Sequence, residues 1–144
     1  MSIQWEDKYS LHISGVDDQH KRIFFLLEQC EKLFSENKDK LFAHIEQIKG
    51  TLLELEQYSI THFLMEEGAM EDSHYPDFES HRNLHIKFTN EIQDLINEMK
   101  KEEILKDEQR LNAFLEKMIQ FISLWIKNHI QKKDIEIKEY VRSL

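Results

Sequence analysis

Residues 62–85 read HFLMEEGAMEDSHYPDFESHRNLH. It holds two pairs of potential metal ligands, His62 with Glu66 and His81 with His85, each spaced by four residues. Four residues make about one turn of an α-helix, so both members of a pair lie on one helix face. The chain's only proline lies between the pairs. We therefore expect two consecutive helices that turn back on each other and share a metal site.

Length and composition predict a single helical domain that spans residues 1–144. With 144 residues the chain can bury one substantial core. Hydrophobic residues make up 40% and charged residues 33%, which is typical of a globular protein rather than a disordered one. Three glycines and one proline are too few for the many tight corners of an all-β fold, so long helices are expected.

Charge and cysteine content limit the partners and the compartment. The formal net charge of −9 argues against nucleic acid and against anionic membrane surfaces as partners. The single cysteine, Cys30, cannot form an internal disulfide and suits a reducing compartment. The N-terminus lacks the apolar core of a signal peptide, and no run approaches the roughly 18 apolar residues of a membrane span. We therefore expect a cytoplasmic protein, and no feature points to a particular protein partner.

Apolar residues at helical spacing predict an all-α, antiparallel, up-down-up-down four-helix bundle with an N-terminal arm and a short C-terminal helix. Asp17 or Asp18 is expected to cap the first helix. The arm is expected at residues 1–16, the bundle at 17–131 and the tail at 132–144. Within the bundle, helices are expected at about 17–37, 41–67, 77–100 and 108–131. Breaks between helices are expected at Gly68–Pro76 and Lys101–Asp107. The inward stripes are Ile23, Phe24, Leu27, Cys30 and Phe34; Leu41, Ile45, Ile48, Leu52 and Leu55; Phe78, Phe88, Ile92, Leu95 and Met99; and Leu111, Leu115, Met118, Ile122 and Trp125.

Each stripe leads to a histidine at the same end of the bundle. His20 lies near the start of the first helix and His129 near the end of the fourth, while the two pairs named above lie at the end of the second helix and the start of the third. In an antiparallel bundle these positions meet. One histidine alone is more often an ordinary packed or surface residue, but an unpaired imidazole in the core is costly. The joint pattern therefore predicts a buried cluster.

Asp134 would complete the cluster, five residues after His129. A step of five residues rotates a side chain by about 140° on a regular α-helix, so a local bulge or a frayed turn is needed to bring Asp134 to the same side. Taken alone, Asp134 would be a solvated charge. Three other histidines are expected to lie at the surface or beside the cluster without joining it: His12, His44 and His74. Glu67 lies about 100° around the helix from Glu66 and is expected to be solvated.

The candidates are too many for one tetrahedral zinc ion, which takes four ligands. Shared between two ions that carboxylates bridge, they describe a histidine-rich dinuclear centre. Imidazole and carboxylate suit iron, and also zinc, copper or nickel. Ferritin-like di-iron bundles instead use four glutamates with Glu-x-x-His pairs, a spacing that these candidates do not have. The candidate ligands are His20, His62, Glu66, His81, His85, His129 and Asp134.

These residues and their neighbours resemble the hemerythrin family, in particular single-domain bacteriohemerythrins, over nearly the whole chain. The resemblance implies a non-haem di-iron centre, bridged by an oxo or hydroxo group, that binds dioxygen reversibly for storage, delivery or sensing. It implies an oxygen-binding protein and not an enzyme. It rests on Trp5, Gly15-Val16-Asp17-Asp18-Gln19-His20-Lys21, His62-Phe63, Glu66-Glu67, Tyr75-Pro76, His81-x-x-x-His85 and Trp125-x-x-x-His129-Ile130-x-x-x-Asp134.

By position, the resemblance divides the ligands into His81, His85 and His129 on one iron, His20 and His62 on the other, and Glu66 and Asp134 bridging both. The iron with two histidines would keep an open position for dioxygen, and Ile126 would line the pocket beside it. Two alternatives stay open: a di-iron enzyme (an oxidase, a peroxidase or a nitric-oxide-handling protein) and an iron-storage module. The enzyme ranks lower because the sequence offers no candidate acid, base or substrate pocket beyond the metal.

Overall fold

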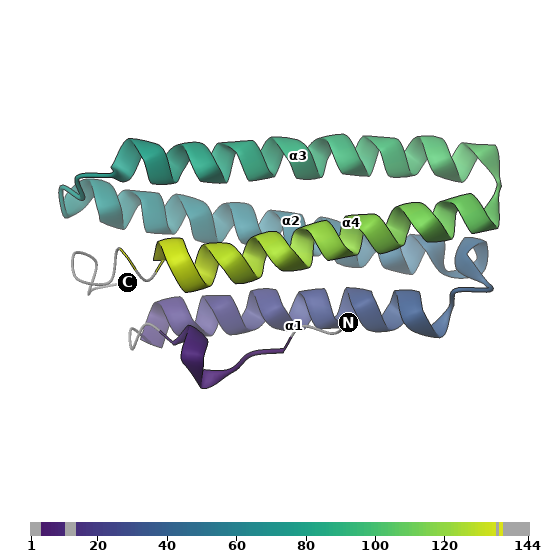
Figure 1. The fold of residues 1–144 in the computed structure, drawn as a ribbon, viewed down its shortest axis with the longest axis horizontal. Coiled ribbons are helices and arrows are strands. Elements are labelled where there is room, and N and C mark those ends of the chain that lie inside the picture. The colour runs from purple at the N-terminus through teal and green to yellow at the C-terminus, as the bar shows by residue number, and fades with distance from the viewer. Residues whose placement is uncertain (1–3, 11–13, 135, 137–144) are drawn as a thin grey trace.

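Four long helices form an antiparallel, up-down-up-down bundle (Figure 1). The computed structural model describes residues 4–10, 14–134 and 136, and within them all regular secondary structure is helical, which confirms the predicted fold class. A 3₁₀ turn precedes the bundle, and a π-helical turn follows its last helix. The elements are η1 (Asp7–Tyr9), α1 (Ser14–Glu36), α2 (Leu41–Asp72), α3 (Phe78–Leu105), α4 (Glu108–Asn128) and η2 (His129–Asp134).

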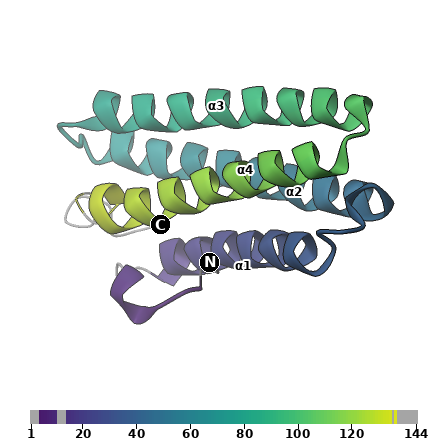
Figure 2. The same cartoon turned by 45° about the vertical axis from the view of Figure 1, so that its right-hand side comes forward.

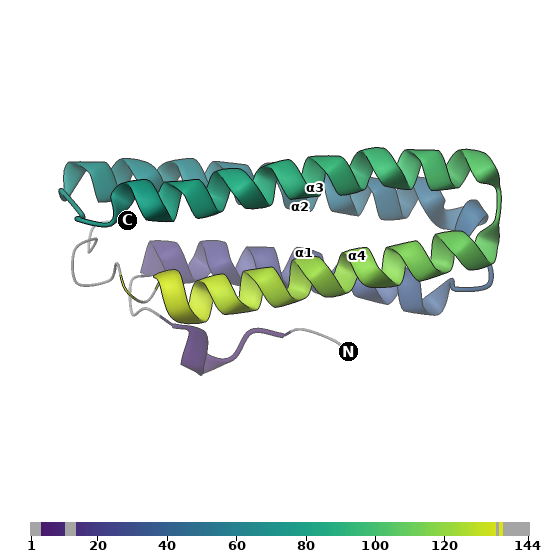
Figure 3. The same cartoon turned by 45° about the horizontal axis from the view of Figure 1, so that its top comes forward.

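Helices that follow one another in the chain pack side by side, and α4 returns to pack against α1. Figure 3 shows the α1–α4 pair lying beside the α2–α3 pair. The turn between α2 and α3 lies at the same end of the bundle as the start of α1 and the end of α4, on the left in Figures 1 and 2. All the predicted ligands belong to this end. None of the described helices is long and apolar enough to cross a membrane.

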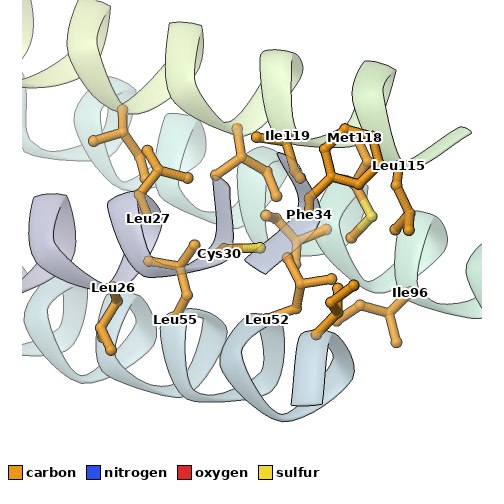
Figure 4. Packing of buried hydrophobic residues seen from close by; sticks show 14 of the residues in the cluster. Leu26, Leu27, Cys30, Phe34, Leu52, Leu55, Ile96, Leu115, Met118 and Ile119 are labelled. Atoms are coloured by element: carbon orange, nitrogen blue, oxygen red, sulfur yellow. The ribbon is translucent and has the colours of Figure 1, made fainter. Parts of the chain in front are cut away.

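Apolar side chains from all four helices form the core (Figure 4). The predicted stripes of α1 and α2 are buried throughout. On α3 the predicted Phe88, Ile92 and Met99 are buried, and Ile96 is buried in place of the predicted Leu95. Three residues that were predicted to point inward are only partly buried: Leu95 and Phe78 on α3 and Trp125 on α4. Cys30 is completely buried, and burial raises the pKa of its thiol to about 12. The thiol therefore stays protonated and inert.

The end of α2 corrects the predicted break at Gly68–Pro76, because the helix continues through Gly68 to Asp72. Met70, on this additional turn, is fully buried and packs with Tyr75. Burying a methionine side chain contributes about 1.5–3 kcal/mol, whereas a glycine inside a helix costs about 1 kcal/mol. The burial of Met70 outweighs the helix-breaking tendency of Gly68, so the turn begins later than the sequence suggested.

The end of α3 corrects the predicted turn at Lys101–Asp107, because the helix continues to Leu105. Its charged residues pair with other helices: Arg110 Nε donates to Glu102 Oε2 at 2.7 Å, and Lys49 Nζ donates to Glu103 Oε2 at 2.9 Å. These long-range pairs let a highly charged segment stay helical. Lys106, with φ at 53°, then ends the helix in the left-handed conformation.

The start of α1 corrects the predicted cap, because the helix begins at Ser14 and both Asp17 and Asp18 lie inside it. Ser10 Oγ donates to Asp17 Oδ2 at 2.5 Å, which ties the N-terminal arm to the first turn. The arm lies against the bundle as expected, with the Trp5 ring edge-on to a core phenylalanine, Phe24. Other residues of the predicted arm and tail lie outside the described part of the chain: Leu11, His12, Ile13, Ile135, Ile137, Tyr140 and Val141.

Candidate metal centre

The structure brings all the predicted ligands together at one end of the bundle, and each is at most 5% exposed. They come from three α-helices and the π-helical turn, so no single segment can form the cluster. The end of α2 and the start of α3 supply two residues each because their i, i+4 spacing keeps each pair on the inner face. The contributions are His20 from α1, His62 and Glu66 from α2, His81 and His85 from α3, and His129 and Asp134 from η2.

The distortion predicted between His129 and Asp134 is confirmed, since η2 is a π-helix over these residues. In a π-helix the hydrogen bonds join residues five apart, so residues i and i+5 lie one above the other. His129 Nε2 therefore lies 3.0 Å from Asp134 Oδ1, where a regular α-helix would point the two side chains about 140° apart.

The ligand atoms form two groups, and within each group they lie no more than 4.8 Å apart. The three-histidine group joins the Nε2 atoms of His81, His85 and His129 to Glu66 Oε1 and Asp134 Oδ1. In this group His81 Nε2 lies 2.7 Å from Glu66 Oε1 and 3.2 Å from Asp134 Oδ1. His85 Nε2 lies 3.0 Å from His129 Nε2.

The two-histidine group joins the Nε2 atoms of His20 and His62 to the other oxygen of each carboxylate. His20 Nε2 lies 3.0 Å from His62 Nε2 and 3.0 Å from Asp134 Oδ2. His62 Nε2 lies 3.0 Å from Glu66 Oε2. Each carboxylate thus turns one oxygen toward each group, which is the arrangement of a carboxylate that bridges two ions.

Unpaired polar atoms test whether this cluster fits metal ions. Glu66 Oε2 and both Asp134 oxygens are buried and make no hydrogen bond within the described residues, although ring nitrogens lie about 3 Å away. Such burial is costly for a carboxylate. Neighbouring ligands about 2.1 Å from one ion are separated by about 3.0 Å, which matches the spacing here. The donors therefore fit two metal ions, while His20 Nδ1 stays unpaired within the described residues.

The electrostatics of the cluster show a site built for positive charge. Burial lowers the pKa of His81, but the close Asp134 and Glu66 carboxylates outweigh burial and raise this pKa to about 9. The pKa of His62 is also raised, because the close Glu66 carboxylate outweighs burial. Burial raises the pKa of both carboxyls, yet the surrounding histidines hold it well below the usual range. The two buried carboxylates therefore attract positive charge to the cluster.

Two residues beside the ligands orient the histidine rings. His85 Nδ1 donates to Glu67 Oε2 at 2.8 Å, and His62 Nδ1 donates to Gln19 Oε1. A metal-bound histidine usually donates its other ring N–H in this way, which directs Nε2 to the ion. Glu67 was expected to be solvated, and the structure corrects this. The sequence held one signal for these two residues: each lies directly beside a candidate ligand, Glu67 beside Glu66 and Gln19 beside His20.

Aromatic rings pack beneath the cluster and hold the histidine planes. Phe63 stacks on His85 with ring centroids 4.0 Å apart, and Trp125 stacks on His129 at 4.4 Å. Trp125 stacks in turn on Phe88 at 3.8 Å. The contacts surround the imidazoles with apolar surface and so strengthen the charge interactions within the cluster.

A cavity of about 10 Å³ lies beside the two-histidine group. Ile126 is buried and lines this cavity. His44 and His74 do not join the site: His44 pairs with Gln47, and His74 is exposed in the turn after α2. The wall is formed by His20, Ile23, Ser59, His62, Phe63, Trp125, Ile126, His129, Ile130 and Asp134.

Comparison with known proteins identifies the family. Residues 11–141 match the model of the hemerythrin HHE cation binding domain. The chain is 26% identical over 138 residues to a bacteriohemerythrin of Clostridium acetobutylicum, covering 95% of this chain and 97% of the relative. It is 28% identical over 138 residues to a bacteriohemerythrin of Pseudomonas aeruginosa (96% and 80% covered) and 25% identical over 134 residues to a hemerythrin-like protein of Naegleria gruberi (93% and 89% covered). Since the family model spans most of the chain, the chain belongs to the hemerythrin family.

Proposed function

We propose that the chain binds dioxygen reversibly at a non-haem di-iron centre, for oxygen storage, delivery or sensing. The observation that carries this proposal is the division of each carboxylate between two ligand groups. A single ion would not need both oxygens of both carboxylates turned to opposite sides. In this proposal His81, His85 and His129 hold one iron, His20 and His62 hold the other, and Glu66 and Asp134 bridge them.

The unequal groups support a role in binding a ligand. The three-histidine group offers five donor atoms and the two-histidine group four. The position left open on the second iron would face the cavity that Ile126 lines. When bound, the iron pair would supply two electrons to dioxygen and recover them on release. The protein's own residues would keep the ions at a fixed separation and surround the open position with apolar side chains.

The size of the cavity favours a small ligand such as dioxygen over the organic substrate of an enzyme. About 10 Å³ is room for roughly one molecule the size of water. Pockets that hold organic substrates are usually several hundred cubic ångströms in volume. A small diatomic ligand therefore suits the space beside the two-histidine group better than an organic substrate does.

Gas cycling of the iron-loaded protein tests the proposal. We would load the protein with ferrous iron under argon, count the iron, and record visible spectra through repeated cycles of air and argon. We expect two irons per chain and an absorption band that appears in air and disappears under argon, without net hydrogen peroxide. His44→Ala, which removes a histidine outside the cluster, should behave like wild type. Irreversible oxidation in the first cycle, or steady formation of a product, would contradict oxygen binding and favour an enzyme.

A further inference from the structure

Ser59 differs from the other helical hydroxyls near it. Thr51, Thr61 and Thr89 each donate to the carbonyl oxygen four residues earlier, at 2.9–3.0 Å. Ser59 is largely buried on α2, at 4% exposed, and its hydroxyl makes none of the hydrogen bonds found among the described residues, although it is not one of the fully enclosed polar atoms that lack a partner. A serine hydroxyl that does not bond to the carbonyl oxygen of the preceding helical turn can donate to a group in the space beside the helix instead.

The position of Ser59 indicates where that acceptor lies. Ser59 lies one helical turn before His62 and lines the cavity beside the two-histidine group. Apart from the proposed metal ligands, only Ser59 and Trp125 bring a polar group to this wall. The Trp125 ring is already stacked between His129 and Phe88. Ser59 is therefore the hydroxyl available to a molecule in the cavity.

We propose that the Ser59 hydroxyl donates a hydrogen bond to a small anionic ligand held in this cavity, and so sets how tightly the centre retains it. This inference rests on the proposed di-iron function. An anion that enters the cavity loses its water, and the isoleucines of the wall cannot replace those hydrogen bonds. One hydroxyl aimed at the ligand restores a bond to a charged acceptor, which is stronger than a bond between neutral groups.

Azide titration of the air-oxidised, iron-loaded protein tests the proposal with a matched pair of variants. Ser59→Thr and Ser59→Val have nearly the same shape and both enlarge the side chain, but only threonine keeps the hydroxyl. We expect the azide dissociation constant of Ser59→Thr to stay within about threefold of wild type and that of Ser59→Val to rise roughly tenfold relative to Ser59→Thr. Ser123→Ala is the control, because Ser123 is also buried but donates to Glu31 outside the cavity.

The infrared stretch of bound azide gives a readout that packing alone does not move. A hydrogen bond from Ser59 should shift this band between H₂O and D₂O in wild type and Ser59→Thr, and the shift should be absent in Ser59→Val. Circular dichroism and iron content would confirm that the variants fold and bind iron. If Ser59→Val does not fold or does not bind iron, Ser59→Ala would replace it.

The outcomes separate this inference from the function it rests on. Equal azide affinity and equal isotope shifts in Ser59→Thr and Ser59→Val would overturn the role of Ser59 and leave oxygen binding intact. A wild-type protein that loads iron but binds neither azide nor dioxygen would refute the proposed function, and the role of Ser59 with it.

Discussion

The difference in stability between the iron-loaded and the metal-free protein should widen as the pH rises. In the metal-free protein, Asp134 and Glu66 outweigh burial and raise the pKa of His81 from 6.5 to about 9. A raised pKa stabilises the folded protein fully below pH 6.5, and this contribution is lost as the pH rises through 9. Iron binds the unprotonated ring, so binding must displace the proton and becomes easier as the pH rises.

The size of the effect follows from the pKa of His81. Displacing one proton costs about 1.4 kcal/mol for each pH unit below the pKa of the group. With a pKa of about 9, the cost falls from roughly 3 kcal/mol at pH 6.5 to almost nothing at pH 9. A change of 1 kcal/mol moves the Tm of a domain of about 150 residues by roughly 3–4 °C. The Tm difference between iron-loaded and metal-free protein should therefore widen by about 10 °C over this range. The pKa of His62 is also raised, so His62 should add to the widening.

Calorimetry under argon checks this prediction. Ferrous-iron-loaded and chelator-treated protein would be scanned at several values between pH 6.5 and 9, with His44→Gln as a control histidine outside the cluster. The control should show the same widening as wild type. A Tm difference that stays constant or narrows with rising pH would refute the argument that iron displaces protons from the buried histidines. Equal Tm values at neutral pH would refute the metal site itself.

Three further predictions concern single residues. Glu66→Ala should lose iron, because both ligand groups lose an oxygen, whereas Glu71→Ala, at an exposed position further along α2, should keep its iron. The iron content per chain is measured in both variants, and unchanged iron content in Glu66→Ala would rule out a bridging role. Ile126→Ala should cost about 2–5 kcal/mol of stability and also shorten the life of the oxygenated form by widening its cavity. Equal spectral decay rates at equal iron loading would remove Ile126 from the ligand pocket. Cys30 should resist a thiol reagent until the protein unfolds, since it is fully buried with a pKa of about 12; rapid labelling of folded protein would show that the core opens.

The sequence could predict the cluster because helices are rigid and regular. Once the apolar stripes place the inner faces, the distance of a residue from the end of its helix gives its height in the bundle. His20 and His129 lie far apart in the chain, yet each is close to the end of a helix and on its inner face, so an antiparallel arrangement must bring them together. Their meeting at one cavity depends on no loop conformation.

Contacts between helices explain what the sequence could not predict. Glu67 lies about 100° around the helix from Glu66 and would face solvent on α2 alone. It is partly buried because α3 packs beside it and offers His85 Nδ1. Gly68 likewise suggests a break in the sequence. The helix continues past it because Met70 is buried against Tyr75, which lies beyond the turn. Both outcomes depend on how closely two segments pack against each other. The spacing of residues within one helix carries no information about that packing.

The π-helical turn connects this physics to the proposed function. A regular α-helix after His129 would turn Asp134 away from the cluster, and the two-histidine group would keep only His20, His62 and one Glu66 oxygen. A π-helical turn is rarely favourable on its own, and such turns concentrate at functional sites. In η2 it carries both Asp134 oxygens to atoms of opposite ligand groups, where a pair of cations would satisfy two acceptors that otherwise stay unpaired within the described residues. In the proposed function, binding two metal ions would supply the free energy that makes this irregular turn favourable. The turn lies at the one place where the spacing of the candidate ligands conflicts with a regular helix.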